Sequence, residues 1–278
     1  MNGESRMKKG PLMGTGRTAE IFAWGDDRIL KLFMDWCPHS WAEREERLSR
    51  IVYEAGLPVP AVEGIIEVNG RSGIIFERIT GRSMPDLIMN EMASNPEEIP
   101  RYGEILAELH TSIHSLEIPN LPSLRDMIER GIQNAKSLSE DSRSRILHVL
   151  DQMEDGTTLC HYDFHPFNII MSPRGPIVID WMTTSQGNPH ADIARTLLIS
   201  QGFQHSIPTN LHSTLRSFID RYLTRYSEIR EISLEELKIW RLPIAAARMN
   251  EDIPYEREWL LSIVSEELMR ESHSRNCC

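Results

Sequence analysis

Hydrophobic and polar positions alternate with a period of two residues in several short segments near the N-terminus. Such alternation is typical of strands that bury one face. Four segments of this kind are predicted strands: residues 19–24, 28–33, 62–68 and 72–78. Gly25-Asp26-Asp27 and Asn69-Gly70 separate the members of each pair and are typical of tight turns. The pattern predicts a small antiparallel sheet that begins near residue 11.

A predicted helix, from about Ser40 to Ala55, separates the two pairs of strands. Its apolar stripe includes one acid, and the members of the stripe recur at helical spacing: Trp41, Glu45, Leu48, Val52 and Ala55. In the strand before this helix, Lys31 shares a face with Ile29 and Phe33. A carboxylate that points toward a core requires a partner. We therefore expect Glu45 to pair with Lys31.

The hydrophobic period changes to that of helices after residues 77–81, where we expect a boundary between two lobes. Further helices are predicted from Pro100 onward and over residues 139–153, 210–226, 234–249 and 255–270. The predicted fold class is α+β. The expected domains are an N-terminal sheet with one helix in residues 1–80 and a larger helical lobe in residues 81–278.

The segment His161-Tyr162-Asp163-Phe164-His165-Pro166-Phe167-Asn168 is followed by Ile177-Val178-Ile179-Asp180-Trp181. Residues 169–171 and 176–179 are predicted strands, and Ser172-Pro173-Arg174-Gly175 is the predicted turn between them. This turn sets Asn168 opposite Ile179, so Asp180 lies beside Asn168 near the loop that holds Asp163. Carboxylate and amide oxygens suit Mg²⁺, a hard ion that usually binds together with substrate phosphates.

The candidate groups follow one order along the chain: a glycine loop, a strand lysine, a helix glutamate, His-x-Asp-x4-Asn and a strand-end aspartate. That order is the signature of protein kinases. Glycines allow backbone N–H groups to approach phosphates closely. The lysine and glutamate position the nucleotide, the amide and the last aspartate hold the metal, and the first aspartate orients the attacking hydroxyl. Each signal is weak alone, and the combined order and spacing support the interpretation.

The chain resembles the aminoglycoside phosphotransferase and choline kinase superfamily, the small-molecule branch of the protein-kinase-like fold. Residues 161–168 resemble its His-Gly-Asp-x-His-x-x-Asn loop, and Ile179-Asp180-Trp181 resembles its metal segment. Gly187-Asn188-Pro189 with Asp192-Ile193-Ala194 resembles its Gly-Asp-Pro…Asp-Leu-Ala continuation. The resemblance extends from about residue 11 to residue 265. It implies a two-lobed fold with a small antiparallel-sheet N-lobe and a larger, mainly helical C-lobe.

The resemblance also implies a reaction, in which ATP and Mg²⁺ serve an O-phosphotransferase that acts on a hydroxyl of a small molecule. The expected acceptor is an amino sugar or aminoglycoside, a sugar or an amino alcohol. The implied roles are a catalytic base at Asp163, metal ligands at Asn168 and Asp180, a phosphate-positioning pair at Lys31 and Glu45, a phosphate loop at Gly14, Gly16, Arg17 and Thr18, and adenine contacts at the backbone of Glu77 and Ile79.

Two residues depart from the pattern of the resembling family. Tyr162 replaces the usual glycine, and Phe167 replaces a small or polar residue. We expect both to narrow the space beside the catalytic loop. Neither replacement removes a reacting group.

Charge and composition limit the partners that we expect. Lys and Arg number 30 and Asp and Glu 41, a net charge of −11. Residues 1–80 hold 11 basic and 12 acidic side chains, which leaves −10 for residues 81–278. Such an acidic surface disfavours nucleic acid and anionic membranes and tolerates a cationic acceptor. The four cysteines form no disulfide framework, and neither a signal peptide nor a membrane span is evident, so the expected location is cytoplasmic. The oligomeric state stays open.

Two other functions are compatible with parts of the sequence. His161, Asp163 and His165 alternate, so on a strand they would share one face and could bind Zn²⁺ in a metallohydrolase. This alternative leaves Asn168 and Asp180 without a role. The second alternative is an inactive, nucleotide-binding regulator, against which the complete set of reacting residues argues. Protein-kinase activity is disfavoured, because no Ala-Pro-Glu segment follows the metal segment.

Overall fold

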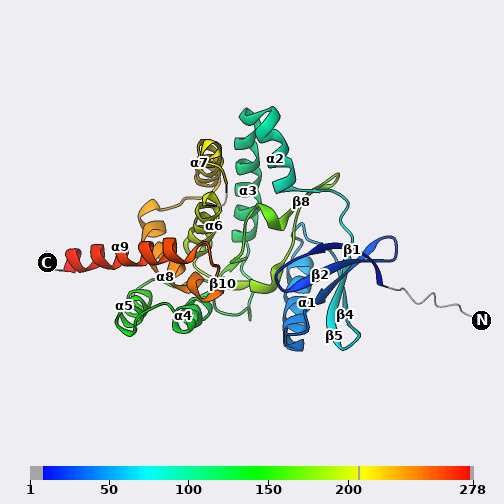
Figure 1. Cartoon of the computed structure of the whole chain (residues 1–278), viewed down its shortest axis with the longest axis horizontal. Coiled ribbons are helices and arrows are strands. Elements are labelled where there is room, and N and C mark those ends of the chain that lie inside the picture. The colour runs from blue at the N-terminus through cyan, green and yellow to red at the C-terminus, as the bar shows by residue number, and fades with distance from the viewer. Residues whose placement is uncertain (1–8, 206, 276–278) are drawn as a thin grey trace, which may run out of the picture. The chain divides into compact units, whose positions relative to one another are not determined.

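A computed structural model describes residues 9–205 and 207–275. The chain divides into two compact units (Figure 1). The first contains residues up to Met84 together with Phe167–Thr183, and the second contains Pro85–Pro166 and the residues from Thr184 onward. One division thus lies close to the expected boundary at residues 77–81. The segment 167–183 packs with the N-terminal unit although it lies far along the chain.

The first unit contains a five-stranded antiparallel sheet in the order β1-β2-β3-β5-β4. Its strands are β1 (Lys9–Thr15), β2 (Ala19–Trp24), β3 (Arg28–Phe33), β4 (Val62–Val68) and β5 (Arg71–Glu77). Asn69 and Gly70 form the β4–β5 turn with φ of 53° and 78°, the left-handed region that this dipeptide favours. The expectation that Gly14 lies in a loop is wrong, because Gly14 pairs with Ile21 of β2 as part of β1.

Helix α1 (His39–Glu54) packs against one face of this sheet. Ala42 of α1 shares a core cluster with Phe33 of β3 and Ile74 of β5, whereas Leu30 and Leu32 belong to a cluster on the other face. The alternation in β3 therefore directs odd-numbered side chains toward α1. Burial of each such apolar side chain stabilises the fold by about 1.5–3 kcal/mol.

The first unit also contains a second sheet, of three strands, in the order β6-β8-β9. Its strands are β6 (Arg82–Ser83), β8 (Ile169–Ser172) and β9 (Gly175–Val178), and the short 3-10 helices η2 (Pro166–Asn168) and η3 (Trp181–Thr183) flank the hairpin. A Cβ at Gly81 would lie 2.4 Å from the carbonyl oxygen of Met171, so only glycine fits there. Val178 N donates to Pro58 O at 2.8 Å, which fixes the hairpin to the loop after α1.

The second unit is mainly helical. Its helices are α2 (Met84–Ser94), α3 (Ile99–His114), α4 (Leu124–Asn134), α5 (Glu140–Asp151), α6 (Pro189–Gln204), α7 (His212–Ile229), α8 (Leu234–Arg248) and α9 (Arg257–Arg275). Short elements connect them: η1 (Pro96–Glu98), β7 (Thr158–Cys160), β10 (Ser185–Gly187), η4 (Thr209–Leu211) and η5 (Met249–Glu251). Ser139 caps α5 by accepting a hydrogen bond from Ser142 N.

Helices α3 and α7 lie side by side (Figure 1). A Cβ at Gly103 of α3 would lie 2.4 Å from Phe218 O of α7. The main apolar core of this unit lies among α4, α5, α6, α8 and α9, and Tyr162 of the loop after β7 belongs to it. Within residues 9–205 and 207–275, no helix is both long and apolar enough to cross a membrane.

Candidate active site

Lys31 of β3 holds two carboxylates of the first unit. Its Nζ lies 2.6 Å from Glu45 Oε1 of α1 and 3.0 Å from Asp180 Oδ1, which follows the β8–β9 hairpin. The alternation in β3 directs Lys31 toward α1, and the stripe of α1 directs Glu45 toward the sheet. The structure therefore brings together the lysine, the helix glutamate and the strand-end aspartate that the sequence singled out.

Burial and charge act in opposite directions on this cluster. The side chains of Lys31 and Glu45 are 12% and 2% exposed, whereas that of Asp180 is 43% exposed. Burial raises the pKa of Glu45 to about 7, although the charge of Lys31 opposes this shift. Burial alone would lower the pKa of Lys31, but Asp180 and Glu45 together raise it above its ordinary value. Lys31 is therefore a cation at neutral pH.

Asn168 and Asp180 lie at the same end of the β8–β9 hairpin. Ile169 pairs with Val178, and Ile179 N donates to Asn168 O at 2.9 Å, so the predicted register is confirmed. The backbone of Asp180 turns sharply here, with a φ of 64°. An amide and a partly exposed carboxylate are hard oxygen donors, so this pair fits a divalent cation such as Mg²⁺.

The predicted phosphate loop lies at the turn between β1 and β2. Gly14 and Thr15 are in β1, Gly16 N donates to Ala19 O at 2.8 Å, and Thr18 O accepts from Met34 N at 2.9 Å. A Cβ built on Gly14 would meet no atom within 4 Å. The surroundings of Gly14 are thus open, and the side chain of Arg17 is exposed.

The predicted adenine-contacting segment lies at the end of β5. Glu77 is the last residue of β5, and its carboxylate accepts from Ala61 N at 3.2 Å and pairs with Arg174 at 2.8 Å. Burial would raise the pKa of Glu77, but Arg174 and the Ala61 N–H lower it below its ordinary value. Ile79 is half-buried in the segment that follows.

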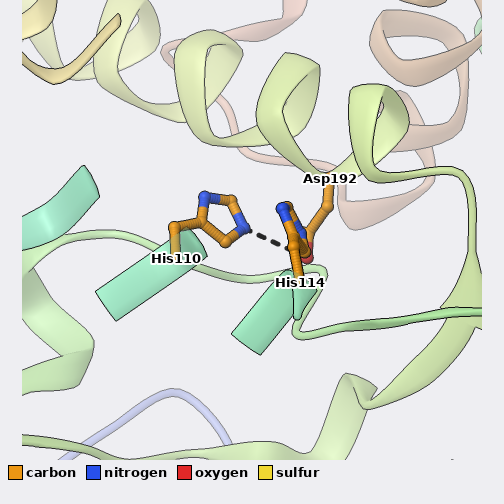
Figure 2. A group of neighbouring side chains, drawn as sticks. All are labelled: His110, His114 and Asp192. Carbon is orange, nitrogen blue, oxygen red and sulfur yellow. Dashed lines mark hydrogen bonds and ion pairs between the residues drawn. The ribbon is translucent and has the colours of Figure 1, made fainter. Parts of the chain in front are cut away.

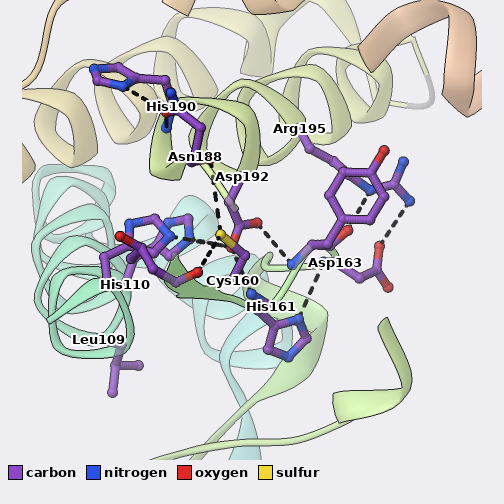
Figure 3. A network of polar contacts seen from close by, with 12 residues as sticks. Leu109, His110, Cys160, His161, Asp163, Asn188, His190, Asp192 and Arg195 are labelled. Carbon is purple, nitrogen blue, oxygen red and sulfur yellow. Dashed lines mark hydrogen bonds and ion pairs between the residues drawn. The ribbon is translucent and has the colours of Figure 1, made fainter. Parts of the chain in front are cut away.

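Asp163 lies in the second unit, on a loop that α6 holds in place. Asp192 of α6 accepts from His161 N at 2.7 Å and from Tyr162 N at 2.9 Å, so it anchors the loop (Figure 3). Asp163 N in turn donates to His161 Nδ1 at 3.3 Å. The strand on which His161, Asp163 and His165 would share a face is not present, because β7 ends at Cys160.

Two basic side chains lie beside the carboxylate of Asp163. Its Oδ2 is 3.4 Å from His165 Nε2, and its Oδ1 is 3.6 Å from Arg195 Nη2 of α6. Burial would raise the pKa of Asp163, but His165 and Arg195 hold it well below its ordinary value. The group is therefore ionised at neutral pH, and its side chain remains 31% exposed.

A buried pair of histidines supports Asp192 from α3 (Figure 2). His110 and His114 each place Nε2 3.3 Å from Asp192 Oδ2. Their Nδ1 atoms lie 2.7 Å from the hydroxyls of Tyr222 and Tyr226 of α7, respectively. Burial lowers the pKa of His114 to about 4, so the ring is neutral at pH 7.

We interpret these histidines as polar support for Asp192, with which His114 Nε2 makes a hydrogen bond. The same geometry could suggest a metal, since the three ligand atoms lie within 4.8 Å of one another. However, both oxygens of Asp192 already accept loop N–H groups, and each imidazole contacts a tyrosine hydroxyl. Neither His114 nor Arg195 was predicted from the sequence. The spacing of His110 and His114, which places both on one face of a helix, was the available signal.

The fold, the Lys31–Glu45–Asp180 cluster and the loop of Asp163 together indicate a kinase-like class of protein. A family model described as "Phosphotransferase enzyme family" matches residues 21–240, and the chain belongs to this family. No curated protein matched the sequence.

Solved structures of small-molecule kinases share the fold. Amicoumacin kinase hAmiN superposes with a TM-score of 0.65 at 13% identity, over 93% of this chain and 87% of that one. An aminoglycoside-3'-phosphotransferase of type VIII gives 0.59 at 18% identity, over 85% and 91% of the two chains. A choline/ethanolamine kinase family protein from Mesorhizobium loti gives 0.54 at 15% identity, over 96% and 87%. The chain therefore has the protein-kinase-like fold that the sequence predicted.

Proposed function

We propose that the protein is an ATP- and Mg²⁺-dependent O-phosphotransferase that acts on a hydroxyl of a small molecule. The observation that carries this proposal is the position of Lys31 Nζ, 2.6 Å from Glu45 and 3.0 Å from Asp180. A buried lysine held between a helix glutamate and a strand-end aspartate is the arrangement with which kinases position nucleotide phosphates. The family to which the chain belongs supports the same reaction class.

The first unit supplies the groups that we propose bind the nucleotide and the metal. Lys31 orients the phosphates of ATP, with the backbone around Gly14 and Gly16 as the phosphate loop and the backbone near Glu77 and Ile79 as the adenine contact. Asn168 and Asp180 hold Mg²⁺, which offsets the negative charge of the phosphates.

Asp163 is the proposed catalytic base. Its pKa lies below the ordinary value, so it is a carboxylate throughout the neutral range and can accept a hydrogen bond from the acceptor hydroxyl. The hydroxyl oxygen then attacks the γ-phosphorus in line, its proton passes to Asp163, and ADP leaves.

The proposed acceptor is an aminoglycoside or other amino sugar, a sugar or an amino alcohol. The net charge of −10 over residues 81–278 favours a cationic member of this group. Two structural relatives named for such molecules, an aminoglycoside phosphotransferase and a choline/ethanolamine kinase family protein, agree with this range.

A turnover assay tests this function. Purified protein is incubated with ATP, Mg²⁺ and a panel of aminoglycosides, sugars and amino alcohols, and ADP formation is measured for wild type, Asp163→Asn and the control Asp220→Asn. Asp220 is an exposed acid of α7. We expect Asp163→Asn to lower turnover by roughly 10²- to 10⁴-fold, with Asp220→Asn equal to wild type. Undiminished turnover in Asp163→Asn would refute the role, and ATP binding without turnover on any acceptor would favour a regulator.

Expression in an antibiotic-sensitive host then narrows the acceptor. If the protein confers resistance to an aminoglycoside and Asp163→Asn abolishes this resistance, the acceptor is an aminoglycoside. If aminoglycosides inhibit this host as strongly as a host without the gene, the proposed acceptor is instead a metabolic sugar or an amino alcohol.

A further inference from the structure

Tyr162 holds a backbone conformation that normally favours glycine. Its φ is 61°, in the left-handed region, where a side chain strains the backbone. The resembling motif has glycine at this position, so the tyrosine needs a compensating interaction. Its side chain is only 6% exposed and packs into the helical core, so it does not line an open pocket beside the loop.

Arg195 supplies this interaction. Its Nε donates to Tyr162 O at 2.5 Å, and its guanidinium carbon lies 4.4 Å from the centroid of the Tyr162 ring. Its Nη2 lies 3.6 Å from Asp163 Oδ1. One buried guanidinium therefore contacts the backbone and ring of one loop residue and the carboxylate of the next.

Arg195 and Asp192 act on the same residue from the same helix. They are three positions apart in α6, so they share a face. Asp192 accepts the N–H of Tyr162, and Arg195 donates to its carbonyl oxygen. One turn of α6 thus binds both the backbone N–H and the carbonyl oxygen of Tyr162, the residue immediately before Asp163.

The guanidinium is itself held from the opposite side. Glu251 Oε1 of η5 lies 2.5 Å from Arg195 Nη2, and Glu251 Oε2 lies 3.2 Å from Arg248 Nη1. Arg248 in turn makes two contacts with the buried Glu256, at 2.6 and 2.9 Å. Charges alternate in sign from Asp163 to Glu256, and the buried guanidinium of Arg195 has a carboxylate on each side, Asp163 and Glu251.

We propose that Arg195 is a positioning residue, which together with the Tyr162 ring sets the direction of the Asp163 carboxylate. The resembling motif has a glycine here, which adopts this backbone conformation without strain. In this protein the stacking of Arg195 on the Tyr162 ring and its hydrogen bond to Tyr162 O stabilise the same conformation. Only an arginine satisfies all three contacts, because its planar fork can stack on a ring while it donates from its edge. The kinetic consequence of this proposal rests on the proposed role of Asp163.

The first test does not require turnover. The carboxyl carbon of Asp163 is followed by ¹³C NMR from acid to neutral pH in wild type, Arg195→Met, Arg195→Lys and Tyr162→Gly. The groups that face this carboxylate are His165, Arg195 and His161, with Glu251 behind the guanidinium. We expect its titration midpoint to rise by about one pH unit or more in Arg195→Met, and by less in Tyr162→Gly, which keeps the charge. A midpoint unchanged in folded Arg195→Met would overturn the proposal.

The second test measures ATP turnover in the same variants. The matched control is Arg225→Met, the same substitution at an α7 arginine that pairs with Glu108. We expect Arg195→Met to lower kcat about 100-fold, with an unchanged KM for ATP, partial recovery in Arg195→Lys and no change in Arg225→Met. The loss caused by Arg195→Met should also be smaller when Tyr162→Gly is present, since the strained residue is then gone. Equal losses in both backgrounds would contradict the coupling.

The two tests separate the possible failures. If Asp163→Asn keeps full turnover, the proposed catalytic role of Asp163 fails, while the NMR midpoint still tests the contact of Asp163 with Arg195. Circular dichroism would show whether Arg195→Met folds. If it does not, the proposal is tested in Arg195→Lys and Tyr162→Gly by the titration midpoint of Asp163 and by kcat. Wild-type midpoints and kcat in both of these variants would overturn the positioning role.

Discussion

Replacement of Lys31 by methionine tests whether the buried cluster of the first unit has been interpreted correctly. Methionine keeps the length and apolar stem of lysine and removes its charge. Glu45, which is 1% exposed, then loses its cation. We expect the variant to fold with reduced stability that depends strongly on pH above 7.

The magnitude follows from the proton on Glu45. Its pKa is raised from 4.5 in the unfolded chain to about 7 in the folded protein. Because the folded state binds more protons between these values, the free energy of unfolding of the wild type falls as pH rises from about 4.5 to 7. Without Lys31 the pKa of Glu45 rises further, since the lysine charge lowers it. Above pH 7 the wild type has released this proton while Lys31→Met retains it.

Lys31→Met should therefore lose about 1.4 kcal/mol relative to the wild type for each pH unit above 7. Near pH 6, where Glu45 is mostly protonated in both proteins, the loss is limited to the lysine hydrogen bonds, about 1–3 kcal/mol. At pH 9 the difference should be larger by about 3 kcal/mol.

Urea unfolding at pH 6, 7, 8 and 9, followed by tryptophan fluorescence, measures these differences. The double variant Lys31→Met with Glu45→Gln removes the titrating acid, so the extra pH dependence should disappear. Lys238→Met is the matched control, because Lys238 pairs with Glu235 on the exposed surface of α8. A constant difference between Lys31→Met and wild type from pH 7 to 9, or a slope that persists in the double variant, would refute the reasoning.

Three further predictions concern other parts of the chain. His114→Gln should reduce acid sensitivity. The pKa of His114 is about 4 in the folded protein and 6.5 in the unfolded chain, so the stability of the wild type falls as pH drops from about 6.5 to 4, and thermal melts should show a shallower fall in the variant. Gly103→Ala should destabilise the protein by about 1–3 kcal/mol in urea, because the new methyl would meet Phe218 O; equal midpoints would contradict the close α3–α7 contact. Asp180→Ala should raise the Mg²⁺ concentration needed for half-maximal ADP formation, and an unchanged Mg²⁺ titration would exclude Asp180 as a ligand.

The hairpin shows how far local patterns predict the site. The turn at residues 172–175 sets the register, and the register alone places Ile179 opposite Asn168. Likewise, the alternation in β3 and the stripe of α1 predict that Lys31 meets Glu45. These features follow from neighbours in the sequence, because strand and helix periods determine which side chains share a face.

Helix α6 marks where pattern analysis fails. It was not predicted, since it is buried on most sides and therefore lacks an amphipathic stripe. Its polar residues Asp192 and Arg195 nevertheless hold the loop that carries Asp163. Their partners come from the loop after β7, from α3 and from η5, which are distant in the sequence.

Local sequence patterns were enough to predict the candidate site residues and part of their geometry: Asp163, the hairpin that carries Asn168 and Asp180, and the Lys31–Glu45 pair. Tertiary structure alone decided how Asp163 is held. Tyr162 adopts a glycine-like conformation because α6 binds both of its backbone polar groups, and Arg195 lies beside it because Glu251 holds the guanidinium from the other side. Such contacts depend on the packing of separate helices, and no period within a single segment encodes them.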